Sequence, residues 1–385
     1  MIPRLDSLRR LGEETAGELL SWRPAHGVLS LYIQVDPGDR SGRWRTEVRS
    51  GLSAVGGNVE TADREAKLAL EATVDRLHKM LEEEFSGGEP RALIGFVEVA
   101  RKPGEERWYG ARIAPGRPRV LFGRAAQIHP LLEILDDGAP LGVAAVSSER
   151  VRLLDWRLGQ AEQLHDWELE YFAGQWRERK GPRTRDPARG QAVSSSGRDQ
   201  HEQRLEANRE RFAKQTGELA RGEAKGRGWR QLLVFGDERY AREFAEGLDD
   251  RDALRHVEGA DLISEPIAKI EGRIEQLLPD LNRERERSLI DRIKEAAYAE
   301  GRSALGPQET LQALGEGRVE HLVYDSERDY PDELEMEGEA AANGLPLIER
   351  MIELALSTSA AITPVEGESA EALNEQGGVI ALLRY

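Results

Sequence analysis

The sequence has 385 residues, of which 32% are charged and 39% hydrophobic, and its formal net charge is −17. A chain of this length exceeds one ordinary hydrophobic core, so it predicts two or three domains, and its composition is that of a globular protein. Cysteine is absent, which excludes disulfides, thiolate nucleophiles, zinc fingers and iron–sulfur clusters.

The spacing of the histidines gives no sign of a metal site. None of the seven histidines lies four residues from another, the spacing that brings two imidazoles together on one helix face, so we expect no metal and no cofactor. The first residues, MIPRLDSLRRLGEE, lack the apolar core of a signal peptide, and no apolar run is long enough to cross a bilayer. We therefore expect a cytoplasmic protein.

The first segment, residues 1–137, is predicted to be an α+β domain. Helical patterns cover residues 5–20 and 62–85, and a continuous apolar run at 27–37 predicts a buried strand between them. Three more strands are expected at 91–99, 107–114 and 119–123.

The second segment, residues 138–264, is predicted to be a mixed α/β domain. It begins with a hairpin whose turn lies at Ser147–Arg150, and a long polar loop then covers residues 173–197. A charged helix follows at about 199–221, with a narrow buried stripe at positions seven apart. This stripe consists of Leu205, Phe212 and Leu219. A strand at 228–237 and a helix at 239–248 complete the segment.

The third segment, residues 265–385, is also predicted to alternate helices with strands. A long charged helix covers residues 267–300, with a kink or break near Pro279. A helix, turn and strand follow at 306–327, and an acidic loop at 329–344 precedes another helix and strand. A Gly-Gly turn and an apolar strand end the chain.

The polar loop is strongly basic although the whole chain is acidic. Residues 173–198 carry seven basic side chains against two acidic ones, a local charge of +5. The basic residues are Arg177, Arg179, Lys180, Arg183, Arg185, Arg189 and Arg198. An acidic chain meets RNA only through such a local patch, so we interpret these residues, with Arg204 in the helix that follows, as an RNA-binding set. A solvated insertion without a ligand is the alternative.

Two glycine–glutamine pairs in this region are candidates for chemistry. Gly197 and Gln200 lie where the loop passes into the helix, and Gly190 and Gln191 lie inside the loop. Glycine permits close approach to a substrate, and a neutral amide can orient a water molecule without titrating. Ser196 and Asp199 are interpreted as helix caps.

Two further groups of residues have a structural and a functional interpretation. Trp156, Trp167, Tyr171 and Trp176 precede the loop and either pack a core or stack on RNA bases, and we favour the core. No cluster of carboxylates on strands is suited to two metal ions, which argues against a nuclease.

Three parts of the sequence together resemble one family. They are the hairpin, basic loop, Gly-x-x-Gln, helix and LLVFGD strand of the second segment, the stretch ALGPQETLQALGEGRVEHLVYDSE (304–327), and the terminal GGVIALLRY (377–385). Their order is similar to the archaeal and eukaryotic class-one release factors and Pelota, and to their bacterial relatives, the Vms-like peptidyl-tRNA hydrolases and the hibernation factor Balon.

This resemblance implies a fold and a set of partners. It implies three domains, with a ribonuclease-H-like middle domain and a C-terminal domain like a kink-turn-binding ribosomal protein. The N-terminal domain would face the decoding side of the ribosomal A site, and the middle domain would meet peptidyl-tRNA at the peptidyl-transferase centre. A translational GTPase such as elongation factor Tu is the implied partner of the last domain.

The resemblance also implies roles for two residues. Gln200 takes the role of the glutamine that helps water attack the peptidyl-tRNA ester, and Gly197 matches the glycine of the Vms-like pattern. The Gly-Gly-Gln of true release factors is missing, which favours rescue, quality control or hibernation over stop-codon termination. We therefore expect a peptidyl-tRNA hydrolase; the alternatives are a non-catalytic hibernation factor in the A site and an α/β adaptor unrelated to the ribosome.

Overall fold

The computed structural model describes most of the chain and divides it into two compact units. Unit 1 consists of Met1–Asp137 with Leu278–Tyr385, and unit 2 consists of Gly138–Leu277. The described residues are 9–10, 14–35, 43–58, 64–82, 91–170, 175–178, 195–248, 254–257, 261–299, 301–330 and 345–385. The division into three domains, at 137/138 and 264/265, stays a prediction.

The N-terminal part of unit 1 is a five-stranded sheet in the order β1-β4-β3-β2-β5. Its strands are β1 (Arg9–Arg10), β2 (Val28–Gln34), β3 (Ala92–Glu98), β4 (Glu106–Ala111) and β5 (Arg119–Gly123). Its helices are α1 (Glu14–Ser21), α2 (Arg43–Asn58), α3 (Arg64–Glu82) and α4 (His129–Asp137). The helix predicted over residues 5–20 is wrong at its start, because Arg9 and Arg10 extend as a strand beside β4.

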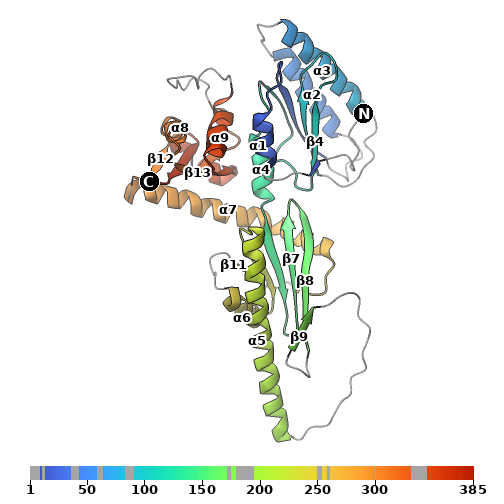
Figure 1. The fold of residues 1–385 in the computed structure, drawn as a ribbon, viewed down its shortest axis with the longest axis vertical. Coiled ribbons are helices and arrows are strands. Elements are labelled where there is room, and N and C mark those ends of the chain that lie inside the picture. Colours follow the sequence, from blue (N-terminus) through green and yellow to red (C-terminus); the bar gives the residue numbers. More distant parts are fainter. Residues whose placement is uncertain are drawn as a thin grey trace. The chain divides into compact units, whose positions relative to one another are not determined.

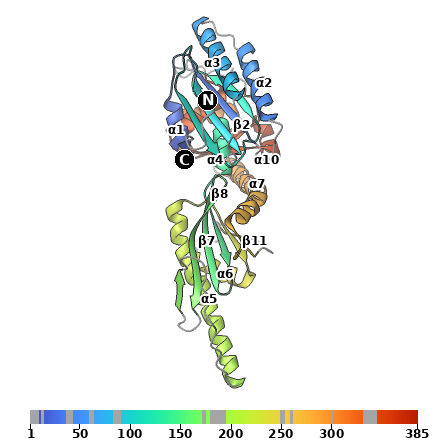
Figure 2. The same cartoon turned by 90° about the vertical axis from the view of Figure 1, so that its right-hand side faces the viewer.

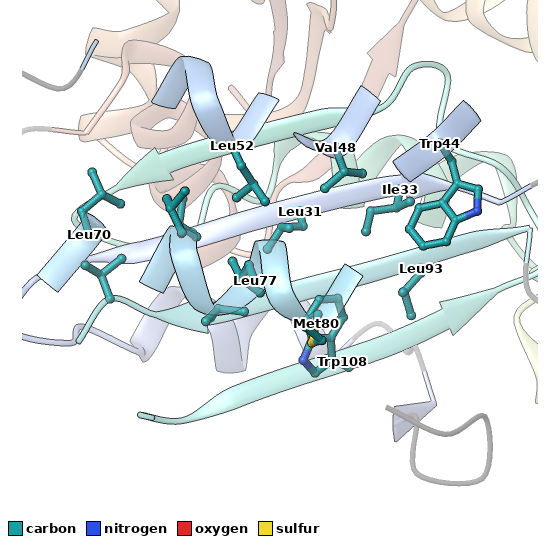
Figure 3. Close-up of a cluster of buried hydrophobic side chains, with 14 of the residues drawn as sticks. Leu31, Ile33, Trp44, Val48, Leu52, Leu70, Leu77, Met80, Leu93 and Trp108 are labelled. Carbon is teal, nitrogen blue, oxygen red and sulfur yellow. The ribbon is translucent and has the colours of Figure 1, made fainter. Parts of the chain in front are cut away.

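A hydrophobic core fills the space between this sheet and helices α2 and α3. Trp44, Val48 and Leu52 follow one another at intervals of four along α2, which places them on one helix face. Figure 3 shows these three side chains pointing toward Leu31 and Ile33 of β2. All five side chains are buried, so the amphipathic faces of the two helices explain why they cover this face of the sheet.

The C-terminal part of unit 1 has a four-stranded sheet in the order β12-β15-β13-β14. Its strands are β12 (Ser303–Leu305), β13 (Val319–Asp325), β14 (Ala361–Val365) and β15 (Val379–Leu383). Helices α7 (Ile267–Ala299), α8 (Pro307–Gly315), α9 (Leu347–Ser357) and α10 (Gly367–Glu371), and the short helix η3 (Asn374–Gln376), complete it. Ile290 and Ile293 of α7 share a core with Val323 and Ile380.

Contacts between distant parts of the sequence hold unit 1 together. The buried carboxylate of Glu349 on α9 accepts the backbone N–H of His129, the first residue of α4, at 3.0 Å, and its Oε1 lies 2.7 Å from His129 Nδ1. Glu349 thus supplies an acceptor to the free amide end of a helix 220 positions earlier in the chain.

Pro279 lies inside α7, which is continuous at this proline and passes from one unit into the other. The predicted kink or break is not seen as an interruption of the helix.

Unit 2 is built on a six-stranded sheet in the order β11-β10-β6-β7-β8-β9. Its strands are β6 (Leu141–Val146), β7 (Arg150–Arg157), β8 (Gln160–Glu170), β9 (Gln175–Glu178), β10 (Leu232–Gly236) and β11 (Leu254–Val257). Helices α5 (Ser195–Arg227) and α6 (Glu238–Leu248) pack on one face. The predicted hairpin turn is confirmed, because Ser147 N–H donates to Arg150 O at 2.9 Å between β6 and β7. The mixed sheets and helices of both units confirm the predicted α/β and α+β class.

No helix in the described part of the chain is both long enough and apolar enough to span a membrane.

Candidate functional site

The candidate glycine and glutamine lie in a helix and not at the tip of a loop. Gly197 and Gln200 fall within the first turns of α5, which begins at Ser195, so the helix starts earlier than the predicted position near Asp199. The residues that follow include good helix formers, which favour extension of the helix toward its N-terminus. A spacing of three places Gly197 and Gln200 on one helix face. Ser196 and Asp199 lie inside the helix, so their interpretation as caps is wrong.

The basic set is only partly within the described residues. Arg177 lies in β9, where it is paired with Glu168 of β8, so the polar region predicted as a loop from 173 onward contains an edge strand. Arg198 lies in the first turn of α5, and Arg204 is exposed on the same helix. The other predicted residues lie outside the described residues; they are Arg179, Lys180, Arg183, Arg185, Arg189, Gly190 and Gln191.

The later part of α5 is held by packing, but not through the predicted stripe. Phe212 is buried as expected, whereas Leu219 is 42% exposed and Leu205 is only half-buried. The buried face consists instead of Phe212 with the small residues Ala213, Thr216 and Ala220. Small side chains contribute little to a hydrophobicity pattern. The prediction therefore assigned the buried face to the leucines and not to these small residues.

Close approach of α5 to α6 explains the small residues. A Cβ atom on Gly217 would lie 2.1 Å from the carbonyl oxygen of Phe244, and one on Gly247 would lie 2.1 Å from that of Lys214. Such distances are far below van der Waals contact, so both positions require glycine. The two helices therefore pack backbone against backbone, which fixes the later part of α5 on unit 2.

An ion-pair network fixes the middle of the same helix. Glu206 accepts the hydroxyl of Tyr240 at 3.0 Å and contacts Arg239 at 2.6 Å and Arg209 at 3.3 Å. Arg209 in turn contacts Glu149 in the β6–β7 turn at 3.1 Å. Desolvation acts to raise the pKa of Glu206, but the hydrogen bonds from Tyr240 and Arg209 and the charge of Arg239 lower it below its ordinary value. Glu206 therefore stays ionised and joins α5 to α6.

The N-terminal end of α5 extends past the sheet of unit 2. Figures 1 and 2 both show this end of the helix beyond the ends of the strands. The positions Glu202, Gln203 and Arg204 are exposed, and Phe212 is the first buried residue of the helix among those described. With a rise of about 1.5 Å per residue, Gln200 lies about 18 Å along the helix from Phe212. The arrangement thus presents Gly197 and Gln200 at the free end of an anchored helix.

Metal chemistry finds no support among the described residues. No group of three or more histidine, aspartate or glutamate side chains within them is placed to hold a metal ion. Two buried carboxylates, Asp155 and Asp166, lie on described strands of unit 2, and each is paired with a guanidinium group. Arg150 donates two hydrogen bonds of 2.7 Å to Asp166, and Arg157 donates one of 2.9 Å to Asp155.

The aromatic series is a core feature where the structure describes it. Trp156 and Trp167 are buried, with exposed fractions of 0% and 3%, which confirms the interpretation as core residues. Tyr171 lies outside the described residues. The network around Glu206 was not predicted from the sequence. Its acids and bases recur at helical spacing along α5, but their partners on α6 cannot be identified before the fold is known.

Comparison with known proteins finds a family that is similar to part of the chain. Residues 127–266 match bacterial archaeo-eukaryotic release factor family 10. No curated protein matches the chain.

Similar chains are also found among solved structures. An archaeal translation termination factor, aRF1, is 21% identical, with 96% of each chain covered and a TM-score of 0.24. Pelota from Archaeoglobus fulgidus is 14% identical, covering 76% of this chain and 79% of Pelota, with a TM-score of 0.33. Dom34 from S. cerevisiae is 8% identical, with the same coverages and a TM-score of 0.40.

These TM-scores are all below 0.5, so the similarity to release factors rests on the family match alone. The matched residues include β6 to β8, the candidate helix α5 and the strand β10. Over residues 127–266, which are about a third of the chain, the sequence is similar to the bacterial archaeo-eukaryotic release factors of family 10.

Proposed function

We propose that the protein is a ribosome-binding translation factor that enters the A site and promotes hydrolysis of peptidyl-tRNA through Gln200. The observation that carries this proposal is the position of Gly197 and Gln200 at the projecting N-terminal end of α5, in a region that matches the release factor family. The proposed partners are ribosomal RNA, peptidyl-tRNA and a translational GTPase such as elongation factor Tu.

The chemistry of this helix end suits ester hydrolysis. The first backbone N–H groups of a helix have no partner within it, and the helix dipole makes this end favourable for negative charge. Both properties favour an oxyanion that develops on the ester carbonyl during attack by water. Gln200 can hold that water in place through its amide, and Gly197, which has no side chain, leaves room for the ester on the same face.

The test is single-turnover peptide release from a purified ribosome–peptidyl-tRNA complex. Gln200→Ala is expected to abolish release while ribosome binding persists, because the change removes the amide and leaves the basic residues in place. Gln215→Ala is the matched control, since Gln215 is an exposed glutamine on the same helix. Equal release by wild type and Gln200→Ala would exclude catalysis by Gln200.

A non-catalytic hibernation factor is the second candidate, and one observation favours it. Gly197 lies within a regular helix, and Arg198 and Asp199 separate it from Gln200. The backbone next to Gln200 therefore has less conformational freedom than in a Gly-Gly-Gln loop. In this case α5 would occupy the A site without performing chemistry. Tight ribosome binding with no release by wild type, together with higher occupancy of ribosomes in starved cells than in growing cells, would select this function.

A further inference from the structure

A polar cavity lies at the opposite end of α5 from Gln200. Ala220 is the last buried hydrophobic residue of α5 and belongs to the core of unit 2. The helix then borders an open cavity of about 610 Å³. It is lined by Asp155, Arg157, Gly222, Glu223, Gly226 and Arg227.

Two arginines in this cavity are held in place by carboxylates. Arg157 Nε donates to Asp155 Oδ2 at 2.9 Å, and Arg227 Nε donates to Glu223 Oε2 at 2.8 Å. Trp229 Nε1 also donates to Asp155, and His165 Nε2 lies 3.2 Å from Glu223. Hydrogen bonds from Arg227 and His165 lower the pKa of Glu223, so this carboxylate stays charged and continues to bind the Arg227 side chain. Arginines fixed in this way lose little conformational freedom when they bind a ligand.

Both arginines keep donors that the described residues do not use. Arg157 donates a second bond, of 2.5 Å, from Nη2 to the carbonyl of Arg227, and Arg227 Nη1 lies 3.7 Å from Asp155. Within the described part of the chain, Arg157 Nη1 and Arg227 Nη2 therefore have no partner. Lys225, one turn from Arg221 on the same helix, is exposed and makes no hydrogen bond or ion pair with these residues. Such donors are the usual ligands of phosphate oxygens.

The glycines of the cavity are not required by the fold. A Cβ atom on Gly222 or Gly226 would meet no atom within 4 Å, in contrast to Gly217, where it would clash with α6. Glycine inside a helix is less stable than alanine, so both positions lower helix stability without any packing reason within unit 2. Their effect is an open helix surface on which a ligand can approach the backbone closely.

We propose that this cavity binds a phosphodiester group of an RNA backbone, as a second RNA contact of unit 2. The proposal rests on the proposed function, since ribosomal RNA is the partner. RNA is favoured over an isolated phosphate because cationic residues continue beyond the cavity: residues 221–230 contain four basic side chains and one acidic one, in a chain of net charge −17. At about 1.5 Å per residue, Arg227 lies about 40 Å along α5 from Gln200, so the two contacts would meet different stretches of RNA.

The experiment measures ribosome binding of the full chain by sedimentation at several salt concentrations. Lys225→Gln and Arg227→Gln are compared with Arg242→Gln, which removes an exposed arginine of α6 paired with Glu238. Arg227→Gln, in the cavity, and Lys225→Gln, next to the lining residue Gly226, are each expected to weaken binding and to reduce the slope of log K against log salt by about 1, the change for one lost phosphate contact. The Arg242 control is expected to leave the slope unchanged.

A second pair of variants separates binding from folding. Gly226→Leu places an apolar side chain in the cavity without a clash. Gly272→Leu is the control: it places the same side chain on α7, where a Cβ atom also meets nothing within 4 Å. Both variants are expected to melt at or above the wild-type temperature, because leucine is the better helix former. Only Gly226→Leu is expected to weaken RNA binding.

The outcomes distinguish this inference from the proposed function. If wild type binds ribosomes and the cavity variants bind like Arg242→Gln, the cavity proposal is wrong while the proposed function stands. If wild type does not bind ribosomes, the proposed function fails. Binding of the full chain to a fluorescently labelled single-stranded RNA then tests the cavity directly. Loss of that binding in Arg227→Gln alone would support it, and binding unaffected by the change, or competed equally well by inorganic phosphate, would overturn it.

Discussion

The two parts of helix α5 differ in what surrounds them. Between Phe212 and Ala220 the helix is packed on α6 and on the sheet, whereas from Glu202 to Arg204 it is exposed and extends beyond the strands. The segment from Phe212 to Ala220 therefore contributes to folding. The segment from Glu202 to Arg204 is free to carry residues that contact a partner. This comparison predicts that substitutions in the two parts have separable effects on stability and on ribosome function.

The largest loss of stability is expected from Phe212→Ala. Phe212 is 1% exposed and lies in the core of unit 2, so its truncation leaves a cavity and is expected to cost about 3–5 kcal/mol of unfolding free energy. Leu219→Ala, seven residues later but 42% exposed, is the control and is expected to cost far less. Denaturant unfolding followed by circular dichroism measures both, and equal losses would show that α5 is not packed as described.

Two glycines of α5 test how closely the helix is packed. Replacing Gly217 and replacing Gly222 by alanine are expected to change stability in opposite directions. Gly217→Ala brings a Cβ atom 2.1 Å from Phe244 O, which forces α5 and α6 apart at a cost of about 1–3 kcal/mol. Gly222→Ala meets no atom within 4 Å and is expected to stabilise the protein by about 0.5–1 kcal/mol. Thermal unfolding of the two variants checks the signs, and a destabilising Gly222→Ala would contradict the open surface.

A smaller effect is expected at the polar network that joins α5 to α6. Tyr240→Phe removes the hydroxyl that donates to Glu206 at 3.0 Å, and we expect a loss of about 1 kcal/mol. The pKa of Glu206 is lowered in the folded state from its ordinary 4.5. Glu206 therefore contributes stability above the unfolded pKa, and this stability is lost as pH falls through the lower folded value.

The pH dependence provides the check on Tyr240. Unfolding is measured at pH 7 and again below pH 4, where the carboxylate is increasingly protonated. The difference between wild type and Tyr240→Phe is expected to shrink at the lower pH. A difference that stays constant with pH would mean that the hydroxyl does not stabilise the ionised form of Glu206.

Strands and amphipathic helices were predictable because their signals are local. The continuous apolar runs of β2, β3 and β10 and the terminal β15 correspond to buried strands in the structure. Helix α2 was missed although Trp44, Val48 and Leu52 recur at helical spacing, because its remaining residues include glycines and arginines that read as a polar connection. Such patterns report which face is buried and not what covers it.

The candidate site was only partly predictable, because its sequence signals are local and its surroundings are not. The glycine–glutamine spacing and the charge of the basic set are properties of the sequence, but the helical position of Gly197 depends on how far α5 extends. Leu219 was assigned to a buried stripe, whereas Gly217 and Gly247 bring the helices so close that small residues form the contact. Partners such as Tyr240 for Glu206 come from a different helix and follow only from the tertiary structure.

The smallest effect on stability, and the one that tests the exposed part of α5 most directly, is expected from Arg204→Gln. Arg204 is exposed and has no hydrogen-bond or ion-pair partner among the described residues, so the change should alter unfolding free energy by no more than about 0.5 kcal/mol. Its charge is nevertheless near Gln200, so we expect weaker ribosome binding and a salt slope lower by about 1. Arg242→Gln on α6 is the control for the loss of one surface charge. If Arg204→Gln instead destabilised the protein and left the salt slope unchanged, this part of α5 would belong to the folded core and not to an RNA contact.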